Sequence, residues 1–529
     1  MMGAMPLIRL TQHASHPLYS TANSRQIEQL AAAQLPPHTL MQRAGLAVAR
    51  LACAVAPHAQ TVWVACGPGN NGGDGLEAAM HLQNWGQETG MKPVVTWLGD
   101  EYHCPPDALA SLHRARAAGV IFALAPPAQC DLAIDALLGI GVSKPLNGVM
   151  ADWLQHMHTH AVAVLCVDLP SGLDADTGCY AESETNSEIA TNNIAIKSIN
   201  TPATYRNESQ NAPIFCLSLL TLKPGLFTAH GKDAAGQVWF DDLGVSEPVD
   251  TAAPPLTPAV LPTAWLLGAD RVSQPPRLHA SHKGTFGDVA VIGGAPSMTG
   301  AALLAARAAL HAGAGRVFVA LLDGGSLSVD PLQPELMFRP LAAVNLREST
   351  TVCGCGGGDA VRHVLPNILS TALRLVLDAD ALNAIAQDTQ LQTQLINRAS
   401  RGFATILTPH PLEAARLLAC STDHVQSHRL QAAQQLADRF ACTVILKGAG
   451  SVIAAPVLSS DTPCINASGN AKLATAGTGD VLAGVAGAVL AGGAEAFDAA
   501  CIAAFRHGAA ADDWPADEIL TASALAQRI

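Results

Sequence analysis

The sequence predicts an α/β protein with two domains, each built on a mainly parallel β-sheet. The chain has 529 residues, which is more than one hydrophobic core usually supports, so two or three domains are expected. Short apolar runs alternate with Ala- and Leu-rich amphipathic segments, as strands and helices do in doubly wound sheets. The runs are apolar on both faces, as in buried parallel strands. The clearest strand candidates are residues 61–66, 161–167, 289–293, 316–322, 374–377 and 443–446.

Composition excludes several other classes of protein. Charged residues make up 14% of the chain and hydrophobic residues 49%, so a disordered, charge-rich chain is excluded. The formal net charge is −13. Proteins that bind nucleic acids or anionic membranes are usually basic, so neither partner is expected. Local anion pockets remain compatible with this charge, because backbone N–H groups can build them.

The mean hydropathy of +0.24 is high for a soluble protein, but no membrane span accounts for it. No Leu/Ile/Val/Phe-rich run reaches the roughly 18–20 residues that a span needs. Residues 1–10 also lack the apolar core of a secretory signal. The 13 cysteines are scattered, and no CxxC spacing is repeated. We therefore expect a cytoplasmic protein whose cysteines are reduced and packed as small apolar groups.

Two segments differ in amino-acid composition from the rest of the chain. Prolines crowd residues 246–276, where helical periodicity is weak, so a domain boundary is expected near residue 250. This divides the chain into an N-terminal domain of residues 1–248 and a C-terminal domain of residues 249–529. Residues 181–209 are rich in Asn, Ser and Thr, which predicts a polar surface insertion in the N-terminal domain.

The first glycine-rich turn follows the strand at residues 61–66. The sequence GPGNNGGDG (67–75) leads into a helix that is expected to begin near Leu76. Glycines permit positive φ and let a ligand approach the backbone closely, and a helix N-terminus attracts anions. The turn therefore predicts a phosphate or pyrophosphate site, although neither a GxGxxG nor a Walker A pattern fits it.

Two further strands of this half end on acidic residues. Asp135 closes a short apolar run before Gly139 and Gly141, and Asp168 follows the strand at 161–167. A single aspartate at a strand end is more often a helix cap or a turn former. Three glycine-flanked acidic turns in one domain favour a binding site, because ligands bind at the carboxyl ends of parallel strands.

The motifs NNGGDGL, DALLGIGVSKPLNG and VDLPSGLDADTG, in this order, resemble the YjeF N-terminal domain family, the NAD(P)H-hydrate epimerases. Residues 40–45 are similar to that family's first helix, and 221–226 to a later segment. The polar stretch 181–209 departs from the family, which normally has a short connection there. The resemblance implies a Rossmann-like, three-layer αβα domain that interconverts the R and S epimers of hydrated NADH and NADPH.

This resemblance also implies roles for single residues. Asp168 would bind the substrate and serve as the acid or base for epimerisation at C6 of the nicotinamide ring. A potassium ion, which prefers hard oxygen ligands, would be bound by Asn71, Asp135 and Ser171. Further contacts to the substrate would come from Asn70, Asn71, Gly72, Gly73 and Asp74. The phosphates would be wrapped by Gly139, Ile140, Gly141, Val142, Ser143, Lys144 and Pro145.

The strongest motif of the C-terminal half is the turn AGTGD, residues 476–480. It opens a long Gly/Ala helix, whose N-terminal N–H groups can form an anion site. Asp480 stands in the first turn, where a carboxylate can activate a hydroxyl group for phosphoryl transfer. Alone, Asp480 could merely favour the helix dipole. The additional segments TPHP (408–411) and KGAGS (447–451) favour a functional site.

The GTGD motif resembles the ribokinase-like superfamily, and HKGTFGDVAVIGG, DADALN, LTPHPLEAARLL and LKGAGSVI resemble the ADP-dependent (S)-NAD(P)H-hydrate dehydratases. The resemblance covers about residues 278–515 and implies a second three-layer αβα domain. The hydrated nucleotide would contact Ala301, Gly358, His410 and Asp480. The adenine nucleotide would be held by Lys447, Gly448, Ala449, Gly450, Ser451 and Gly479. One departure is the sequence GCGGG at 354–358, where the family usually shows GPGLG.

Together the two resemblances imply a bifunctional repair enzyme for hydrated NADH and NADPH that consumes ADP. Its ligands would be NADHX or NADPHX and ADP, with K⁺ in the first domain and Mg²⁺ beside the nucleotide phosphates of the second. A homo-oligomer is compatible with the sequence. Two alternatives stay open: a kinase of a small hydroxylated vitamin or sugar, and an N-terminal domain that serves as a regulatory module or a non-catalytic scaffold.

Overall fold

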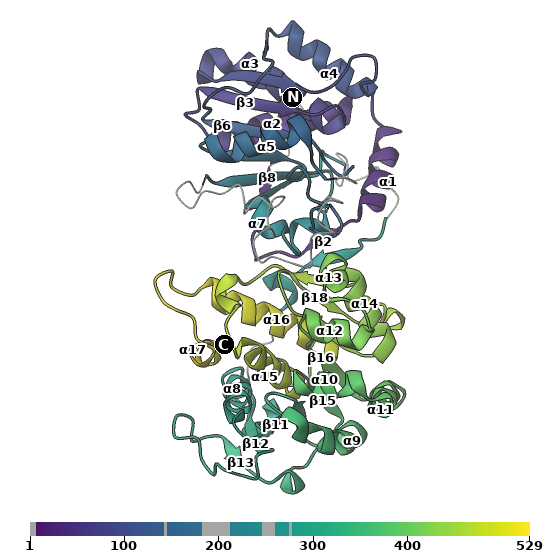
Figure 1. The fold of residues 1–529 in the computed structure, drawn as a ribbon, viewed down its shortest axis with the longest axis vertical. Helices are drawn as coiled ribbons and strands as arrows, with labels where there is room; N and C mark the ends of the chain where they lie inside the picture. Colours follow the sequence, from purple (N-terminus) through teal and green to yellow (C-terminus); the bar gives the residue numbers. More distant parts are fainter. Residues whose placement is uncertain (1–6, 142–144, 182–211, 246–259, 274–277) are drawn as a thin grey trace, which may run out of the picture. The chain divides into compact units, whose positions relative to one another are not determined.

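The protein is described here by a computed structural model that covers residues 7–141, 145–181, 212–245, 260–273 and 278–529. It forms two compact units (Figure 1). The N-terminal unit comprises Met1–Thr11 and Pro17–Thr263, and the C-terminal unit comprises Gln12–His16 and Ala264–Ile529. The expected boundary at 248/249 and nearly all of the expected insertion at 181–209 lie outside the described residues.

The N-terminal unit is built on an eight-stranded sheet in the order β1-β9-β8-β7-β6-β3-β4-β5. Its neighbouring strands are parallel except for β1 and β9. The strands are β1 (Ile8–Arg9), β3 (Thr61–Cys66), β4 (Lys92–Trp97), β5 (Ile121–Phe122), β6 (Leu132–Ala136), β7 (Val164–Val167), β8 (Ile214–Leu219) and β9 (Gln237–Asp241). The helices are α1 (Thr21–Ala32), α2 (Thr39–Val55), α3 (Asn70–Thr89), α4 (Pro106–Ala117), α5 (Gly148–His160) and α7 (Gly231–Ala235).

Strand β3 shows why this sheet has helices on both faces. Its side chains alternate, so Val62 and Val64 join the core formed with α2 and α3, whereas Trp63 points to the opposite face. There the Trp63 ring meets Trp153 of α5, with 6.4 Å between ring centroids. Helices therefore cover the sheet on two sides, and the predicted three-layer α/β arrangement is confirmed for this unit.

The second sheet has 11 strands in the order β13-β12-β11-β14-β15-β16-β17-β18-β19-β10-β2. All of these strands belong to the C-terminal unit except β2, of which only His16 does. The strands are β2 (His16–Leu18), β10 (Ala264–Leu266), β11 (Asp288–Gly293), β12 (Arg316–Leu321), β13 (Met337–Phe338), β14 (Thr350–Cys353), β15 (Arg374–Leu377), β16 (Ala404–Leu407), β17 (Thr443–Leu446), β18 (Ser451–Ala454) and β19 (Cys464–Asn466). The helices are α8 (Thr299–His311), α9 (Val361–Thr371), α10 (Asp380–Gln387), α11 (Thr389–Ser400), α12 (Pro411–Leu418), α13 (Thr422–Ser427), α14 (Arg429–Phe440), α15 (Thr478–Ala491), α16 (Ala496–Asp512) and α17 (Ala522–Arg528).

The central strands of this sheet also contribute side chains to two cores, one on each face of the sheet. In β14, Val352 joins the core packed under α8, α15 and α16, whereas its neighbour Cys353 joins the core under α9, α10 and α14. Figure 1 shows these two groups of helices on opposite sides of the strands. This double burial explains why the strand candidates have apolar residues on both faces. The α/β class with mainly parallel sheets is thus confirmed for both units.

The structure describes no helix that is long and apolar enough to cross a membrane. All 13 cysteines are free thiols, as expected from their scattered spacing.

Candidate functional sites

A cavity of about 620 Å³ opens at the carboxyl ends of the central strands of the N-terminal unit. From β3 the chain continues through α3 to β4 on one side, whereas β6 pairs with β3 on the other side. Such a switch point leaves a crevice in which α/β proteins bind ligands. The lining includes the sequence-predicted residues Asn70, Asn71, Asp74, Gly139, Ile140, Gly141 and Asp168.

Helix α3 begins at Asn70, so the prediction that it begins near Leu76 is wrong. None of the glycines in 67–75 uses the positive φ that glycine permits. Their role is close packing: a Cβ on Gly72 would lie 2.0 Å from the carbonyl oxygen of Gly67, and one on Gly73 would lie 2.7 Å from Met41. The glycines therefore let α3 begin close to the end of β3. Asn70 and Asn71 lie in the first turn of this helix.

The other predicted contacts of this half fall into two groups. Gly72 and Gly73 are buried and, within the described residues, do not border the cavity, whereas their neighbour Asp74 does. Val142, Ser143 and Lys144 lie outside the described residues. Pro145 follows them directly in the loop before α5.

Asp168 follows β7 in a left-handed conformation with φ +66°, which costs energy for a residue with a side chain. Its Oδ1 accepts a hydrogen bond from Leu219 N at 3.1 Å and another from Lys223 Nζ. The Lys223 side chain is only 2% exposed, and its Nζ also donates to Leu219 O at 2.8 Å. The strained backbone and the buried lysine hold the Asp168 carboxylate at the cavity wall.

Three more carboxyl groups border the same cavity, those of Glu28, Asp74 and Asp107. Burial raises the pKa of Asp74 well above its usual value, and the negative charge of Asp168 raises it further. Burial likewise raises the pKa of Glu28, again with a contribution from Asp168. Burial therefore favours the protonated form of Asp74 and Glu28 beside the ion-paired Asp168, and carboxyl groups in such different environments are typical of acid–base sites.

Of the three predicted potassium ligands, Asn71 borders the cavity, and Asp135 and Ser171 adjoin Leu137 and Leu138 of its lining. Asp135 and Ser171 are both 1% exposed. The Asp135 carboxylate accepts hydrogen bonds from Ser171 Oγ at 2.6 Å, Ser171 N at 2.9 Å and Leu137 N at 3.2 Å. Burial raises the pKa of Asp135, and these hydrogen bonds oppose the rise. Asn71 has a buried Nδ2 atom without a hydrogen-bond partner, and a Cβ on Gly139 would lie 3.3 Å from its Oδ1.

The second group of predicted residues gathers at the carboxyl ends of β11, β14, β15, β16 and β17. The turn after β14 packs on the turn after β11, because Cys355 O accepts from Gly294 N at 3.0 Å. A Cβ on Gly356 would lie 2.9 Å from the Cβ of Ala301. Gly358 N donates to Asp380 Oδ2 at 2.8 Å. The structure therefore brings Ala301 and Gly358 to one edge of the sheet.

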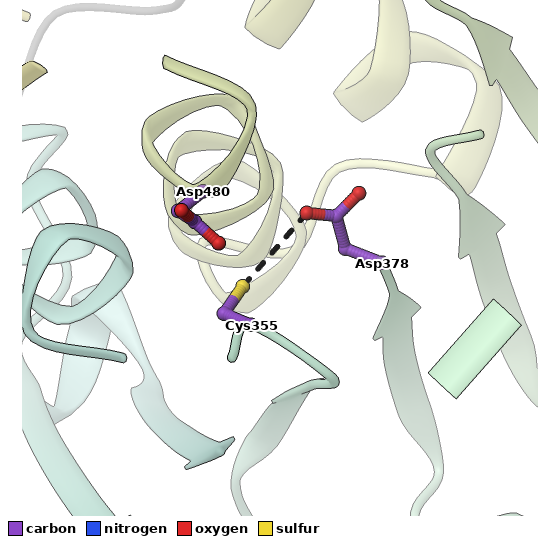
Figure 2. Close-up of side chains that lie close together, drawn as sticks. All are labelled: Cys355, Asp378 and Asp480. Carbon is purple, nitrogen blue, oxygen red and sulfur yellow. Dashed lines mark hydrogen bonds between the residues drawn. The ribbon is translucent and has the colours of Figure 1, made fainter. Parts of the chain in front are cut away.

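Asp480 stands in the first turn of α15, after an N-cap glycine, Gly477, with φ +91°. Burial raises the pKa of Asp480 to about 7, and the neighbouring charge of Asp378 adds to the rise. The Sγ atom of Cys355 and one carboxylate oxygen each of Asp378 and Asp480 all lie within 4.8 Å of one another. Figure 2 shows these side chains converging at the N-terminus of α15. Asp480 can thus take up a proton near neutral pH.

Lys447 brings positive charge to this helix end. Its Nζ donates to Asp378 Oδ1 at 2.7 Å, and a Cβ on Gly479 would lie 3.2 Å from the same Nζ. Burial alone lowers the pKa of Lys447, but the charges of Asp378 and Glu413 outweigh it, so the pKa is raised. A charged ammonium group and the helix N-terminus together favour a phosphate.

His410 is the N-cap of α12, as the TPHP motif predicts. Its Nδ1 accepts hydrogen bonds from the N–H groups of Leu412 and Glu413, at 3.1 and 3.3 Å. The ring proton therefore belongs on Nε2, which lies 3.2 Å from Glu413 Oε1. Burial raises the pKa of Glu413 to about 6 and lowers that of His410.

The structure adds four site residues to which sequence reasoning gave no role: Lys223, Cys355, Asp378 and Arg429. Arg429 is buried and donates through one nitrogen to the carbonyls of Leu446, Lys447 and Gly450, which holds the predicted nucleotide loop 447–451. Asp378 stands directly after β15 in the DADALN motif, so its position at a strand end is a usable signal. Buried cationic residues carry no comparable mark in the sequence.

The two sites define the class of protein. A crevice at the switch point of one sheet and a GTGD-type helix terminus on another sheet belong to an enzyme with two α/β nucleotide-binding domains. Family models agree: one described as YjeF-related protein N-terminus matches residues 37–197, and one described as NAD(P)H-hydrate dehydratase matches residues 289–529.

Known proteins extend this match to most of the chain. The bifunctional NAD(P)H-hydrate repair enzyme Nnr of Escherichia coli (strain K12) is 34% identical, over 90% of this chain and 85% of its own length. The ADP-dependent (S)-NAD(P)H-hydrate dehydratase of Neisseria meningitidis serogroup B is 43% identical, over 45% of this chain and 80% of its own. A crystal structure of the Bacillus subtilis ADP/ATP-dependent NAD(P)H-hydrate dehydratase matches at 27% identity and a TM-score of 0.40, covering 49% of this chain and 92% of that one. The chain belongs to the family of bifunctional NAD(P)H-hydrate repair enzymes, and both resemblances drawn from the sequence are confirmed.

Proposed function

We propose that this chain repairs hydrated NADH and NADPH in two steps. The N-terminal unit interconverts the R and S epimers, and the C-terminal unit dehydrates the S epimer with ADP as phosphoryl donor. The observation that carries the proposal is the position of Asp480. It stands in the first turn of α15 with a pKa of about 7, beside Lys447, whose Nζ adjoins Gly479.

In the N-terminal unit, Asp168 takes the proton of the C6 hydroxyl while the C6–N1 bond breaks, and it gives this proton to N1, which opens the ring to an aldehyde. Reversal of these transfers, with N1 adding to the other face of the aldehyde, closes the ring with the opposite configuration at C6. The Asp168 carboxylate lines the cavity with Asn70, Asn71 and Asp74. Lys223 is the positioning residue, because its Nζ binds the same Oδ1 that accepts from Leu219 N. The first turn of α3 and residues 139–141 supply backbone N–H groups for the phosphates.

In the C-terminal unit, Asp480 takes the proton of the C6 hydroxyl while the hydroxyl oxygen attacks the terminal phosphorus of ADP, which leaves AMP. The electron pair of the ring nitrogen then expels phosphate from C6. Loss of a proton from C5 forms the double bond of the dihydronicotinamide. Phosphorylation is needed because hydroxide is a poor leaving group at neutral pH. Lys447 and the N-terminus of α15 stabilise the negative charge of the transferred phosphoryl group.

A potassium ion fits the residues proposed for it. Asp135, Ser171 and Asn71 offer hard oxygen atoms. In the described part of the chain, the hydrogen bonds to the buried carboxylate of Asp135 come from neutral groups, the N–H of Leu137 and the N–H and Oγ–H of Ser171. When bound, the ion would neutralise this charge and attract the phosphates of the substrate to the adjoining loop.

Magnesium has no comparable set of protein ligands in the described residues. In the C-terminal unit, the cluster of Cys355, Asp378 and Asp480 includes a thiol. A thiol is a soft donor, which Mg²⁺ disfavours as a ligand. The Oδ1 atom of Asp378 in the same cluster is occupied by Lys447 and Thr408, each at 2.7 Å. We therefore propose Mg²⁺ as a companion of the ADP phosphates and assign it no side chain.

An epimer-resolved repair assay tests this function. Purified protein is incubated with the separated R and S hydrates and either ADP or ATP, while reduced nicotinamide, AMP and phosphate are measured. We expect ADP-dependent recovery from the S epimer at once, and from the R epimer after epimerisation. Phosphorylation of a vitamin or sugar alcohol without any recovery of NADH would instead establish a small-molecule kinase.

A further inference from the structure

The thiol of Cys355 occupies the centre of the proposed dehydratase site. Its Sγ lies 3.9 Å from Asp378 Oδ2 and belongs to the three-residue cluster with Asp480 (Figure 2). The side chain is fully buried, as is that of Cys353 two residues earlier. The two thiols pack in different cores, Cys355 with α15 and Cys353 with α9 and α10. Of these two buried thiols, only that of Cys355 lies at the proposed site, so Cys353 can serve as its control.

We propose that Cys355 is a positioning residue of the dehydratase site, a neutral hydrogen-bond donor that keeps the carboxylates of Asp378 and Asp480 apart and leaves Asp480 free for the substrate. This inference rests on the function proposed above. Cys355 stands where the sequence, GCGGG at 354–358, departs from the family's GPGLG pattern. The contact is thus a property of this chain, because a proline ring at that place has no donor to offer.

The hydrogen bonds of Asp378 show why a donor is needed at this point. Its Oδ1 accepts from both Lys447 Nζ and Thr408 Oγ1, so Oδ2 is the oxygen that faces the thiol and, beyond it, Asp480. Two carboxylates this close repel each other. An S–H group between them can donate to either oxygen. Burial raises the pKa of the Cys355 thiol well above its usual value, so the thiol keeps its proton at neutral pH.

Three variants test the inference: Cys355→Ala removes the donor, Cys355→Ser keeps one, and Cys353→Ala removes the matched thiol from the other core. In Cys355→Ala we expect kcat for dehydration of the S epimer to fall by about tenfold. The KM for ADP should stay within about twofold. Cys355→Ser should recover most of the lost kcat, and Cys353→Ala should keep the kcat of the wild type.

The pH profile of kcat separates positioning from a loss of packing. The groups that face Asp480 are Asp378, Cys355, Lys447 and Asp380, and among them only the thiol is changed. In Cys355→Ala, Asp378 Oδ2 loses the thiol that faces it, so the charge of Asp378, which raises the pKa of Asp480, acts on Asp480 without an intervening donor. The acid limb of the Cys355→Ala profile should therefore move to higher pH. In Cys355→Ser the limb should return toward its wild-type position.

Three results would overturn the inference: an unchanged kcat and pH profile in Cys355→Ala, a serine variant as impaired as the alanine variant, or an equal loss in Cys353→Ala. Thermal unfolding followed by circular dichroism checks that each variant is folded. Cys355→Val, which has no donor, replaces the alanine variant if that one does not fold. Failure of the proposed function itself is recognised separately, because the wild-type protein would then not convert the S epimer at all.

Discussion

At the scale of single residues, Asp480 shows how burial can suit a carboxyl group to the role of general base proposed above. A carboxyl group in water is ionised at neutral pH and holds its proton too weakly to be an efficient base. Partial burial at the start of α15 and the charge of Asp378 raise the pKa of Asp480 to about 7. The N-terminus of α15 and Lys447, which lie beside it, limit this rise because they favour the ionised form.

This pKa leads to the first prediction. A base acts only when it is ionised, so kcat for dehydration should fall tenfold per pH unit well below about 7 and level off above it. Above about pH 7, Asp480→Asn should lower kcat by about 10²–10⁴-fold, since general acid–base catalysis contributes that much, and the difference from the wild type should narrow as the pH falls below about 7. The measurement is the pH profile of S-epimer repair with saturating ADP. A variant that keeps the wild-type profile would assign the base to another group.

The second prediction concerns Lys223, which binds Asp168 from a buried position. Lys223→Met removes the cation from the carboxylate and leaves the left-handed Asp168 with its backbone donor, Leu219 N. We expect epimerisation to fall by about tenfold or more, as buried ion pairs do not tolerate the loss of one partner. Lys232→Met, on the exposed surface of α7, is the control. Equal epimerisation rates for the two variants would contradict a positioning role for Lys223.

Sequence reasoning reached Asp168 and Asp480 because each stands beside glycines at the end of a strand or the start of a helix. It gave no role to Lys223 or Asp378, because what makes them functional is a contact with a residue distant in sequence. Lys223 meets Asp168 across 55 residues, and Asp378 meets Lys447 across 69. A pattern within one segment contains no information about such partners.

At the scale of secondary-structure elements, the strands were predicted closely and one helix start was not. The strands at 61–66, 374–377 and 443–446 have the predicted bounds, because a run buried on both faces is visible in the sequence itself. The start of α3 was placed six residues too late, since Asn and Gly have low helix propensity. Packing against the loop before the helix and against Met41 overrides that propensity.

The third prediction tests such packing where α15 crosses α8. A Cβ on Gly484 would lie 2.1 Å from the carbonyl oxygen of Ala305, so Gly484→Ala must push the two helices apart. We expect a loss of about 1–3 kcal/mol in the free energy of unfolding, as for other overpacked cores. Gly300→Ala, on the exposed side of α8 with open space at its Cβ, should instead stabilise the helix by about 0.5–1 kcal/mol. Urea unfolding followed by circular dichroism measures the free energy of unfolding of both variants. Equal free energies for Gly484→Ala and Gly300→Ala would contradict this account of the packing.

At the scale of the whole molecule, the described residues of each proposed site belong to one compact unit. The residues that border the N-terminal cavity all belong to Pro17–Thr263. The cluster of Cys355, Asp378 and Asp480, with Lys447, belongs to Ala264–Ile529. A net charge of −13 is nevertheless compatible with polyanionic nucleotides at both proposed sites, because helix termini, backbone N–H groups and single lysines can supply a local positive potential.

This separation leads to the last prediction, that two inactive chains should restore each other's missing step. Asp168→Asn should repair the S epimer but not the R epimer, and Asp480→Asn should interconvert the epimers without forming NADH. Because each site needs residues from one unit only, an equimolar mixture of the two variants with ADP should recover NADH from the R epimer. The S epimer released by one chain would be dehydrated by the other. The recovery is measured as absorbance of reduced nicotinamide, against each variant alone as the control for spontaneous epimerisation. A mixture no faster than Asp168→Asn alone would show that the hydrate must pass between the two sites of a single chain.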